Sequence, residues 1–244
     1  MQRIKCIISY DGSLFSGYQV QVDKRTVQGE IEAVLTKMHK TAVKVIASGR
    51  TDAGVHAYGQ VIHFDTTLDI PAARWVQALN AMLPHDISVL SAEYAEPSFH
   101  ARYDAKGKKY RYVIDLRKIR DPLKRNYSFH YPHDINVERI EKAIPYIVGT
   151  HDFSSFCAAN TDVLDKVRTI YSIQCLLAGN QLTLTYSGNG FLYNMVRILT
   201  GTLVEIGNGK RKPEEMKDII SAMDRGAAGK TAPAQGLYLQ EVYY

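Results

Sequence analysis

The chain has 244 residues, of which 45% are hydrophobic, and it carries a formal net charge of +5. That length suits one large domain or two closely associated subdomains. Its apolar runs are much shorter than the roughly 20 residues that a membrane helix needs, and we expect no signal peptide. Three cysteines without a C-x-x-C pair argue against a disulfide framework and against a zinc site. We therefore expect a cytoplasmic protein that binds no metal and no membrane.

Strand and helix patterns alternate through the first half of the chain. An apolar stripe recurs at helical spacing over residues 27–38, which predicts a helix with one face in the core. Strand patterns precede and follow it. The other predicted elements are strands at 4–10, 43–47, 60–64 and 87–94 and a helix that starts near Pro71.

The second half of the chain shows a similar alternation. Residues 109–114 have the period of a strand, so Tyr110 and Tyr112 share one face, and Lys109 and Arg111 share the other. Residues 191–206 are apolar nearly all round, which predicts a buried helix. The other predicted elements are a helix around 140–147, strands at 169–177, 181–186 and 237–242, and a short helix after Pro213.

The order of these elements predicts an α+β fold with two similar α/β subdomains. Consecutive strands joined by a short turn at 178–180 favour antiparallel pairing. No low-complexity linker separates the two halves. We therefore predict largely antiparallel sheets flanked by helices, in an N-terminal subdomain at 1–105 and a C-terminal subdomain at 106–244 that form one catalytic unit.

One acid stands out in the segment Ser48-Gly49-Arg50-Thr51-Asp52-Ala53-Gly54-Val55-His56-Ala57, which follows a predicted strand. Asp52 lies between two glycines, which permit a left-handed backbone and let a ligand approach closely. Arg50 would add positive charge to the same loop. The alternative is an ordinary Asp-Gly turn.

Arg197 lies on the predicted buried helix. A buried guanidinium costs several kcal/mol unless it meets an anion. Asp52 is an attractive partner, because a nearby arginine would keep that acid ionised and ready to act as a nucleophile or base. The alternative is a structural salt bridge with another acid.

Positive charge gathers around one predicted strand and the loop that follows it. Tyr110 lies between two cations, where its ring could stack on a flipped-out base while the cations hold the RNA backbone. The alternatives are an ordinary sheet tyrosine and a solvated basic face. The basic residues are Lys109, Arg111, Arg117, Lys118, Arg120, Lys124 and Arg125, of which the last five fall within nine positions.

The sequence contains none of several common cofactor signatures. It has no phosphate-loop motif, no G-x-G-x-x-G after a strand, no H-E-x-x-H and no G-x-S-x-G. We therefore expect no nucleotide, nicotinamide or zinc cofactor.

Taken together, these residues resemble the TruA-type tRNA pseudouridine synthases. Residues 49–57 match the catalytic motif of that family without a gap. Position 18 departs from the pattern, because it is Tyr where many members carry Trp. The other matches are Tyr10-Asp11-Gly12 with Phe15, Gly17, Gln19 and Gln21; Phe99 with Ala101-Arg102; Tyr110-Arg111-Tyr112; Gly149 with His151-Asp152-Phe153 and Phe156; Asn194-Met195-Val196-Arg197; and Ala232-Pro233-Ala234 with Gly236-Leu237.

The resemblance implies a pseudouridine synthase fold with a central active-site cleft and no cofactor. It implies that Asp52 is the essential carboxylate for breaking the bond between uracil N1 and ribose C1′, after which the base rejoins through C5. It also implies that Tyr110 stacks on the target base and that Arg197 pairs with Asp52. Three further residues, Arg50, His56 and Leu237, are implied to bind the substrate.

The family acts on the anticodon arm of tRNA at positions 38, 39 or 40, and its members work as homodimers. The resemblance therefore implies a tRNA-modifying isomerase in which the basic residues line an RNA cleft. Two alternatives stay open. One is a catalytically silent tRNA-binding or chaperone protein on the same scaffold, and the other is an enzyme with the same chemistry and a different tRNA position or RNA as its target.

Overall fold

The computed structural model describes residues 1–158 and 163–244 and divides the chain into two compact units. The first unit contains Met1–Lys106 and Tyr238–Tyr244, and the second contains Gly107–Leu237. The predicted C-terminal subdomain contains all of 106–244, whereas the first unit of the structure includes Lys106 and Tyr238–Tyr244. The structure differs at the C-terminus because the last strand, β10 (Leu237–Tyr243), pairs in parallel with β3 (His56–Thr66) of the first unit.

The strands of the first unit follow the order β4-β1-β3-β10, with the short β2 beside β3. The central strand β1 pairs antiparallel with both β3 and β4. Only β10 runs parallel to its neighbour β3. The remaining bounds are β1 Gln2–Tyr10, β2 Ile46–Ala47, β4 Ile87–Ala95, α1 Val27–His39 and α2 Ala72–Asn80.

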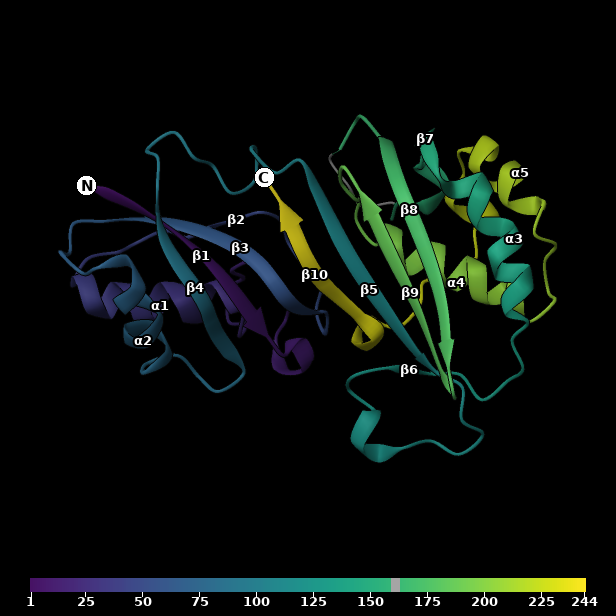
Figure 1. Ribbon diagram of the computed structural model, residues 1–244, viewed down its shortest axis with the longest axis horizontal. Coiled ribbons are helices and arrows are strands. Elements are labelled where there is room, and N and C mark those ends of the chain that lie inside the picture. Colours follow the sequence, from purple (N-terminus) through teal and green to yellow (C-terminus); the bar gives the residue numbers. More distant parts are fainter. Residues whose placement is uncertain (159–162) are drawn as a thin grey trace. The chain divides into compact units, whose positions relative to one another are not determined.

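Helices α1 and α2 build the core of the first unit against one face of its sheet (Figure 1). The fully buried Trp75 of α2 meets Phe64 of β3 edge to face, with ring centroids 5.1 Å apart, and stacks on His39 of α1 at 5.9 Å. Thr26 caps α1 by accepting a hydrogen bond from the Gly29 amide. Such a cap satisfies one of the amides that a helix start leaves unpaired.

The strands of the second unit follow the order β5-β9-β8-β7, and β6 pairs with β5. The β5–β9, β9–β8 and β8–β7 pairs are antiparallel, and β6 runs parallel to β5. The expected turn at 178–180 connects β8 to β9. The bounds are β5 Gly107–Asp115, β6 Phe129–His130, β7 Gly149–Asp152, β8 Val167–Ala178, β9 Gln181–Gly188, α3 Val137–Ile147, α4 Met195–Gly207 and α5 Glu215–Ala222.

Helix α4 is the buried helix of the second unit, and Figure 1 shows it with α3 and α5 on one side of the sheet. Every residue of α4 except Arg197 is buried, which confirms the predicted burial. The helix begins at Met195, whereas the sequence pattern had suggested a start near 191. Asn194 ends the preceding segment in the left-handed conformation, with φ of 62°, so the helix does not extend further back.

The structure confirms the predicted α+β class with largely antiparallel sheets and flanking helices. The strand predicted at 43–47 is shorter than expected, because β2 contains only Ile46–Ala47. In the described part of the chain, none of the helices combines the length and the apolar character that crossing a membrane requires.

His63 is a buried neutral histidine in β3. Its side chain is 2% exposed, and its Nδ1 accepts a hydrogen bond from the Ala101 amide at 3.1 Å. Burial, reinforced by the positive charge of Arg3, lowers the pKa of His63 to about 4. In the unfolded chain the pKa is about 6.5. The unfolded state therefore binds the proton more readily, and the free energy of unfolding should fall as pH drops from about 6.5 towards 4.

We predict that His63→Asn flattens this part of the pH dependence, because asparagine keeps an acceptor for the Ala101 amide but does not titrate. Urea unfolding of both proteins between about pH 4 and pH 7 measures the effect. A decline of equal steepness in the variant would assign the pH dependence to other groups.

Candidate active site

Asp52 lies in the tight turn between β2 and β3, and its side chain is half-buried. The turn is closed by a hydrogen bond of 3.1 Å from the Val55 amide to the Asp52 carbonyl. Gly54 has φ of 78°. This left-handed conformation has little steric cost for glycine, because glycine has no Cβ. Arg50, two residues before Asp52, is exposed.

Two glycines of the loop after β1 fit closely against the Asp52 turn. Gly17 has φ of 96°, and a Cβ at this position would lie 3.0 Å from the Thr51 carbonyl oxygen and 3.4 Å from the Asp52 carbonyl carbon. A Cβ on Gly12 would collide with the Val55 carbonyl. These contacts therefore hold the backbone on both sides of Asp52. Larger residues in place of Gly12 and Gly17 would push the loop after β1 away from the turn.

A buried polar network fastens the same turn to β1 and β3. Ser48 Oγ donates to Gln60 Oε1 at 2.7 Å, and Gln60 Nε2 donates to the Gly49 carbonyl at 2.9 Å. The hydroxyls of Tyr10 and Thr51 share a hydrogen bond of 2.8 Å. Burial raises the pKa of Tyr10 to about 12, so its hydroxyl stays protonated at neutral pH. The network therefore supports the turn with neutral hydrogen bonds.

Gln60 is not among the site residues predicted from the sequence. Gln60 is fully buried in a strand whose next residues, Val61 and Ile62, are apolar. A buried amide needs hydrogen-bond partners. The signal in the sequence was therefore a polar residue inside an apolar strand, although the sequence does not identify the partners.

His56, which the resemblance assigns to substrate binding, is the first residue of β3 and is 2% exposed. Its Nδ1 accepts a hydrogen bond from the Gly12 amide at 3.0 Å and lies 3.2 Å from Asp11 Oδ1. Its ring stacks on Tyr238 of β10 with centroids 4.7 Å apart. Within the first unit, His56 therefore joins the loop after β1 to the last strand.

Tyr110 lies on β5, where it is buried and stands opposite Tyr186 of β9. Its ring meets Phe191 edge to face, with centroids 5.1 Å apart. Its strand neighbours Lys109 and Arg111 are half-buried. The predicted alternation is therefore present over residues 109–112, whereas residues 112–115 are all buried.

Arg197 is the one half-buried residue of α4. Its Nε donates to the Ala232 carbonyl at 2.8 Å, and its Nη1 donates to Asn194 Oδ1 at 2.7 Å. The Ala232 amide returns a hydrogen bond of 3.0 Å to the Arg197 carbonyl. These contacts orient the guanidinium and tie the 225–236 segment to α4.

The 225–236 segment is also held by β5. The Tyr112 hydroxyl donates to the Pro233 carbonyl at 2.6 Å. A Cβ on Gly236 would lie 2.7 Å from the Tyr112 ring, so this glycine allows close packing. The segment leads directly to Leu237, which is buried.

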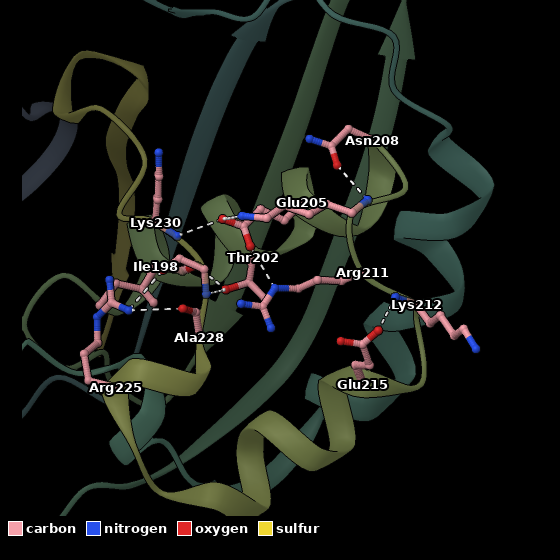
Figure 2. A network of polar contacts seen from close by, with 12 residues as sticks. Ile198, Thr202, Glu205, Asn208, Arg211, Lys212, Glu215, Arg225, Ala228 and Lys230 are labelled. Atoms are coloured by element: carbon pink, nitrogen blue, oxygen red, sulfur yellow. Dashed lines mark hydrogen bonds and ion pairs between the residues drawn. The ribbon is translucent and has the colours of Figure 1, made fainter.

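A second network joins α4 to residues 229 and 230 of the same segment (Figure 2). The nearly buried Glu205 accepts hydrogen bonds from Arg211 Nε at 2.7 Å and from the Lys230 amide at 3.3 Å. Thr202 Oγ1 accepts a hydrogen bond of 2.9 Å from the Gly229 amide. Helix α4 therefore fixes the segment at several points along its length.

The predicted basic residues differ in their surroundings. Arg117 Nη2 lies 2.6 Å from Asp115 Oδ2, and its Nη1 lies 3.1 Å from Asp121 Oδ2. Lys118 Nζ lies 2.7 Å from Asp134 Oδ1. These acids offset part of the positive charge. Lys118 is exposed, as are Arg120, Lys124 and Arg125 of the same loop.

The candidate residues belong to different units. Arg50, Asp52 and His56 stand in the first unit, and Tyr110, Arg197, Leu237 and the basic residues stand in the second. Over residues 1–158 and 163–244, no cluster of three or more His, Cys, Asp or Glu side chains could hold a metal ion.

Comparison with known proteins relates the whole chain to one family. The family model described as tRNA pseudouridine synthase matches residues 6–104 and 143–244. Similar relatives are tRNA pseudouridine synthase A of Geobacillus sp. (strain WCH70), 56% identical over 100% of this chain and 98% of the relative, and that of Bacillus subtilis (strain 168), 55% identical over 99% of each.

Among solved structures, a chain of a Cbf5-Nop10-Gar1 complex is similar, with 12% identity and a TM-score of 0.36. The match covers 83% of this chain and 54% of that chain, so this chain spans about half the length of the solved one.

We predict that Gln60→Leu loosens the Asp52 turn, because it removes the acceptor of the buried Ser48 hydroxyl and the donor to the half-buried Gly49 carbonyl. The free energy of unfolding should fall by about 1–3 kcal/mol, as is typical for unsatisfied buried groups. Amide hydrogen exchange over residues 48–55 should accelerate. Gln77→Leu, at an exposed position of α2, is the matched control. Unchanged exchange in Gln60→Leu would show that the network does not hold the turn.

Proposed function

The chain belongs to the tRNA pseudouridine synthase family, and from this premise we propose that its targets are uridines 38, 39 and 40 of the tRNA anticodon arm and that Asp52 is its catalytic carboxylate. As a member of the family it is an isomerase that converts uridine in tRNA to pseudouridine. The observation that carries the proposal is the 56% identity to a tRNA pseudouridine synthase A over the full chain.

The surroundings of Asp52 support a catalytic role. Its turn is held by close contacts with Gly12 and Gly17 and by the network around Gln60. A carboxylate whose backbone is fixed in advance needs little rearrangement to reach a reactive geometry, which lowers the barrier of the chemical step.

The proposed reaction breaks the N1–C1′ bond of a uridine and forms a C5–C1′ bond. The proton on C5 leaves, and N1 gains a proton, so the uridine is rearranged with no net gain or loss of atoms. Such an isomerisation requires no redox partner and no group donor. We assign to Asp52 the cleavage of the N1–C1′ bond.

We propose that Tyr110 stacks on the target base and that Arg197 keeps Asp52 ionised. The hydrogen bonds from Arg197 to Ala232 and Asn194 support a role for an oriented guanidinium. The proposed substrate-binding set also includes Arg50, His56 and Leu237. We further propose that the enzyme works as a homodimer in the cytoplasm.

We predict that Asp52→Asn folds and binds tRNA but releases no tritium from tRNA labelled at uridine C5, because the amide keeps the shape of the side chain and loses its charge. Asp69→Asn, at an exposed position of the same unit, should retain wild-type release. Substantial release by Asp52→Asn would remove the assigned role. If wild type binds tRNA without releasing tritium, the protein is a silent tRNA-binding protein.

We propose that the exposed basic residues bind the tRNA backbone. The triple variant Arg120→Ala, Lys124→Ala and Arg125→Ala should bind tRNA more weakly. The slope of log K against log salt concentration should become less negative by about 0.7–0.9 for each phosphate that is no longer neutralised. Lys217→Ala, on α5, is a control for a change of surface charge. A wild-type slope in the triple variant would place the RNA-binding surface elsewhere.

A further inference from the structure

An aromatic pair lies on the surface of the first unit, in the loop between β4 and β5. The Tyr103 ring stacks on the His100 ring, with centroids 4.2 Å apart and an interplanar angle of 25°. Tyr103 is nevertheless 77% exposed, so the ring face that points away from His100 is open to solvent. Single exposed aromatic residues are common on protein surfaces. This pair differs from such single residues because hydrogen bonds hold both its loop and the His100 ring in place.

The loop that carries the pair is fastened to the sheet of the first unit. Arg3 Nη1 donates to the Pro97 carbonyl at 2.6 Å and to the Phe99 carbonyl at 2.8 Å. The Tyr244 hydroxyl donates to the Ala101 carbonyl at 2.6 Å. The aromatic pair therefore stands on a loop that is tied to both the first strand of the unit and the C-terminal residue that follows its last strand.

His100 is itself held in place. Its Nδ1 accepts hydrogen bonds from the amides of Arg102 and Tyr103, each at 3.2 Å, and its own amide donates to Asp104 Oδ2 at 2.7 Å. Its ring meets the buried His63 edge to face, with centroids 5.2 Å apart. A ring that is fixed before binding loses little conformational entropy when a ligand stacks on it.

The segment that carries the pair, residues 100–106, is slightly basic in sequence. Within residues 100–106 there are two cations, Arg102 and Lys106, and one acid, Asp104. An open aromatic face next to cations is the arrangement that binds unpaired nucleotides, because the base stacks on the ring and the phosphates meet the positive charge.

We propose that Tyr103, supported by His100, is a stacking site for an unpaired base of the substrate tRNA, in addition to the site of the reaction. Arg102 and Lys106 contact the phosphates beside that base. The proposal rests on the proposed function in one respect, namely that tRNA is the ligand. Because the stacked base is not the base that reacts, the site contributes to binding and not to the chemical step.

The test compares tRNA affinity among variants of the full-length protein. Tyr103→Ala should weaken binding about 5- to 150-fold, the range for removal of one stacked base. Tyr103→Phe keeps the ring and should bind like wild type. The matched control is Tyr94→Ala, because Tyr94 is a half-exposed tyrosine of β4 in the same unit. In tritium release, Tyr103→Ala should raise KM and leave kcat unchanged.

A photoreactive phenylalanine analogue at position 103 gives a readout that does not depend on turnover. It should crosslink to an unpaired nucleotide of the tRNA. Wild-type affinity in Tyr103→Ala, or a crosslink confined to paired nucleotides, would overturn the proposal. So would an equal loss of affinity in Tyr103→Phe, which would assign the effect to the hydroxyl.

The outcomes also separate this inference from the proposed function. If wild type releases no tritium but Tyr103→Ala still loses affinity for tRNA, the stacking site stands and the proposed reaction falls. If wild type is active and Tyr103→Ala is indistinguishable from it in affinity and KM, the stacking site falls and the proposed reaction stands. Melting temperatures of all variants, measured in the same buffer, exclude unfolding as the cause of lower affinity.

Discussion

Close packing and hydrogen bonds hold the backbone on either side of Asp52. Displacing this backbone would cost free energy, and the proposed chemistry depends on this constraint. Gly12 and Gly17 allow the loop after β1 to approach the turn more closely than any side chain would permit. Gln60 holds the same turn with buried hydrogen bonds. Loss of one partner would remove a buried hydrogen bond, which costs free energy of folding. The backbone position of Asp52 is therefore set by the fold of the first unit before any substrate arrives.

The second unit holds its candidate residues in a comparable way. Arg197 is oriented by a carbonyl and an amide oxygen, and the segment it contacts is held again by Tyr112 and by Glu205. In both units the candidate residues stand on backbone that is bonded to rigid elements. Such preorganisation reduces the cost of reaching a reactive geometry. The exposed pair of Tyr103 and His100 is preorganised in the same way, because its loop is hydrogen-bonded to the sheet of the first unit before a ligand binds.

Much of the fold could be predicted from the sequence because local periodicity marks α1, β5 and α4 clearly. The Asp52 turn could be found because an acid between two glycines is a local signal. Longer-range contacts could not be found in this way. Arg197 contacts Ala232 35 residues away, and the parallel pairing of β10 with β3 has no local signal. The pairing of Arg117 with Asp115 and Asp121 is local, because these acids lie two residues before and four residues after Arg117 in the sequence.

The central claim is that this chain isomerises uridines of the anticodon arm, and mapping of the product tests it most directly. Unmodified tRNA transcripts would be incubated with wild-type protein, and pseudouridine would be located at single-nucleotide resolution. We expect pseudouridine at positions 38, 39 or 40 wherever a transcript carries uridine there, and at no other position. Pseudouridine confined to another region of the tRNA would contradict the assigned target, and its complete absence under conditions where the tRNA binds would contradict the assigned reaction.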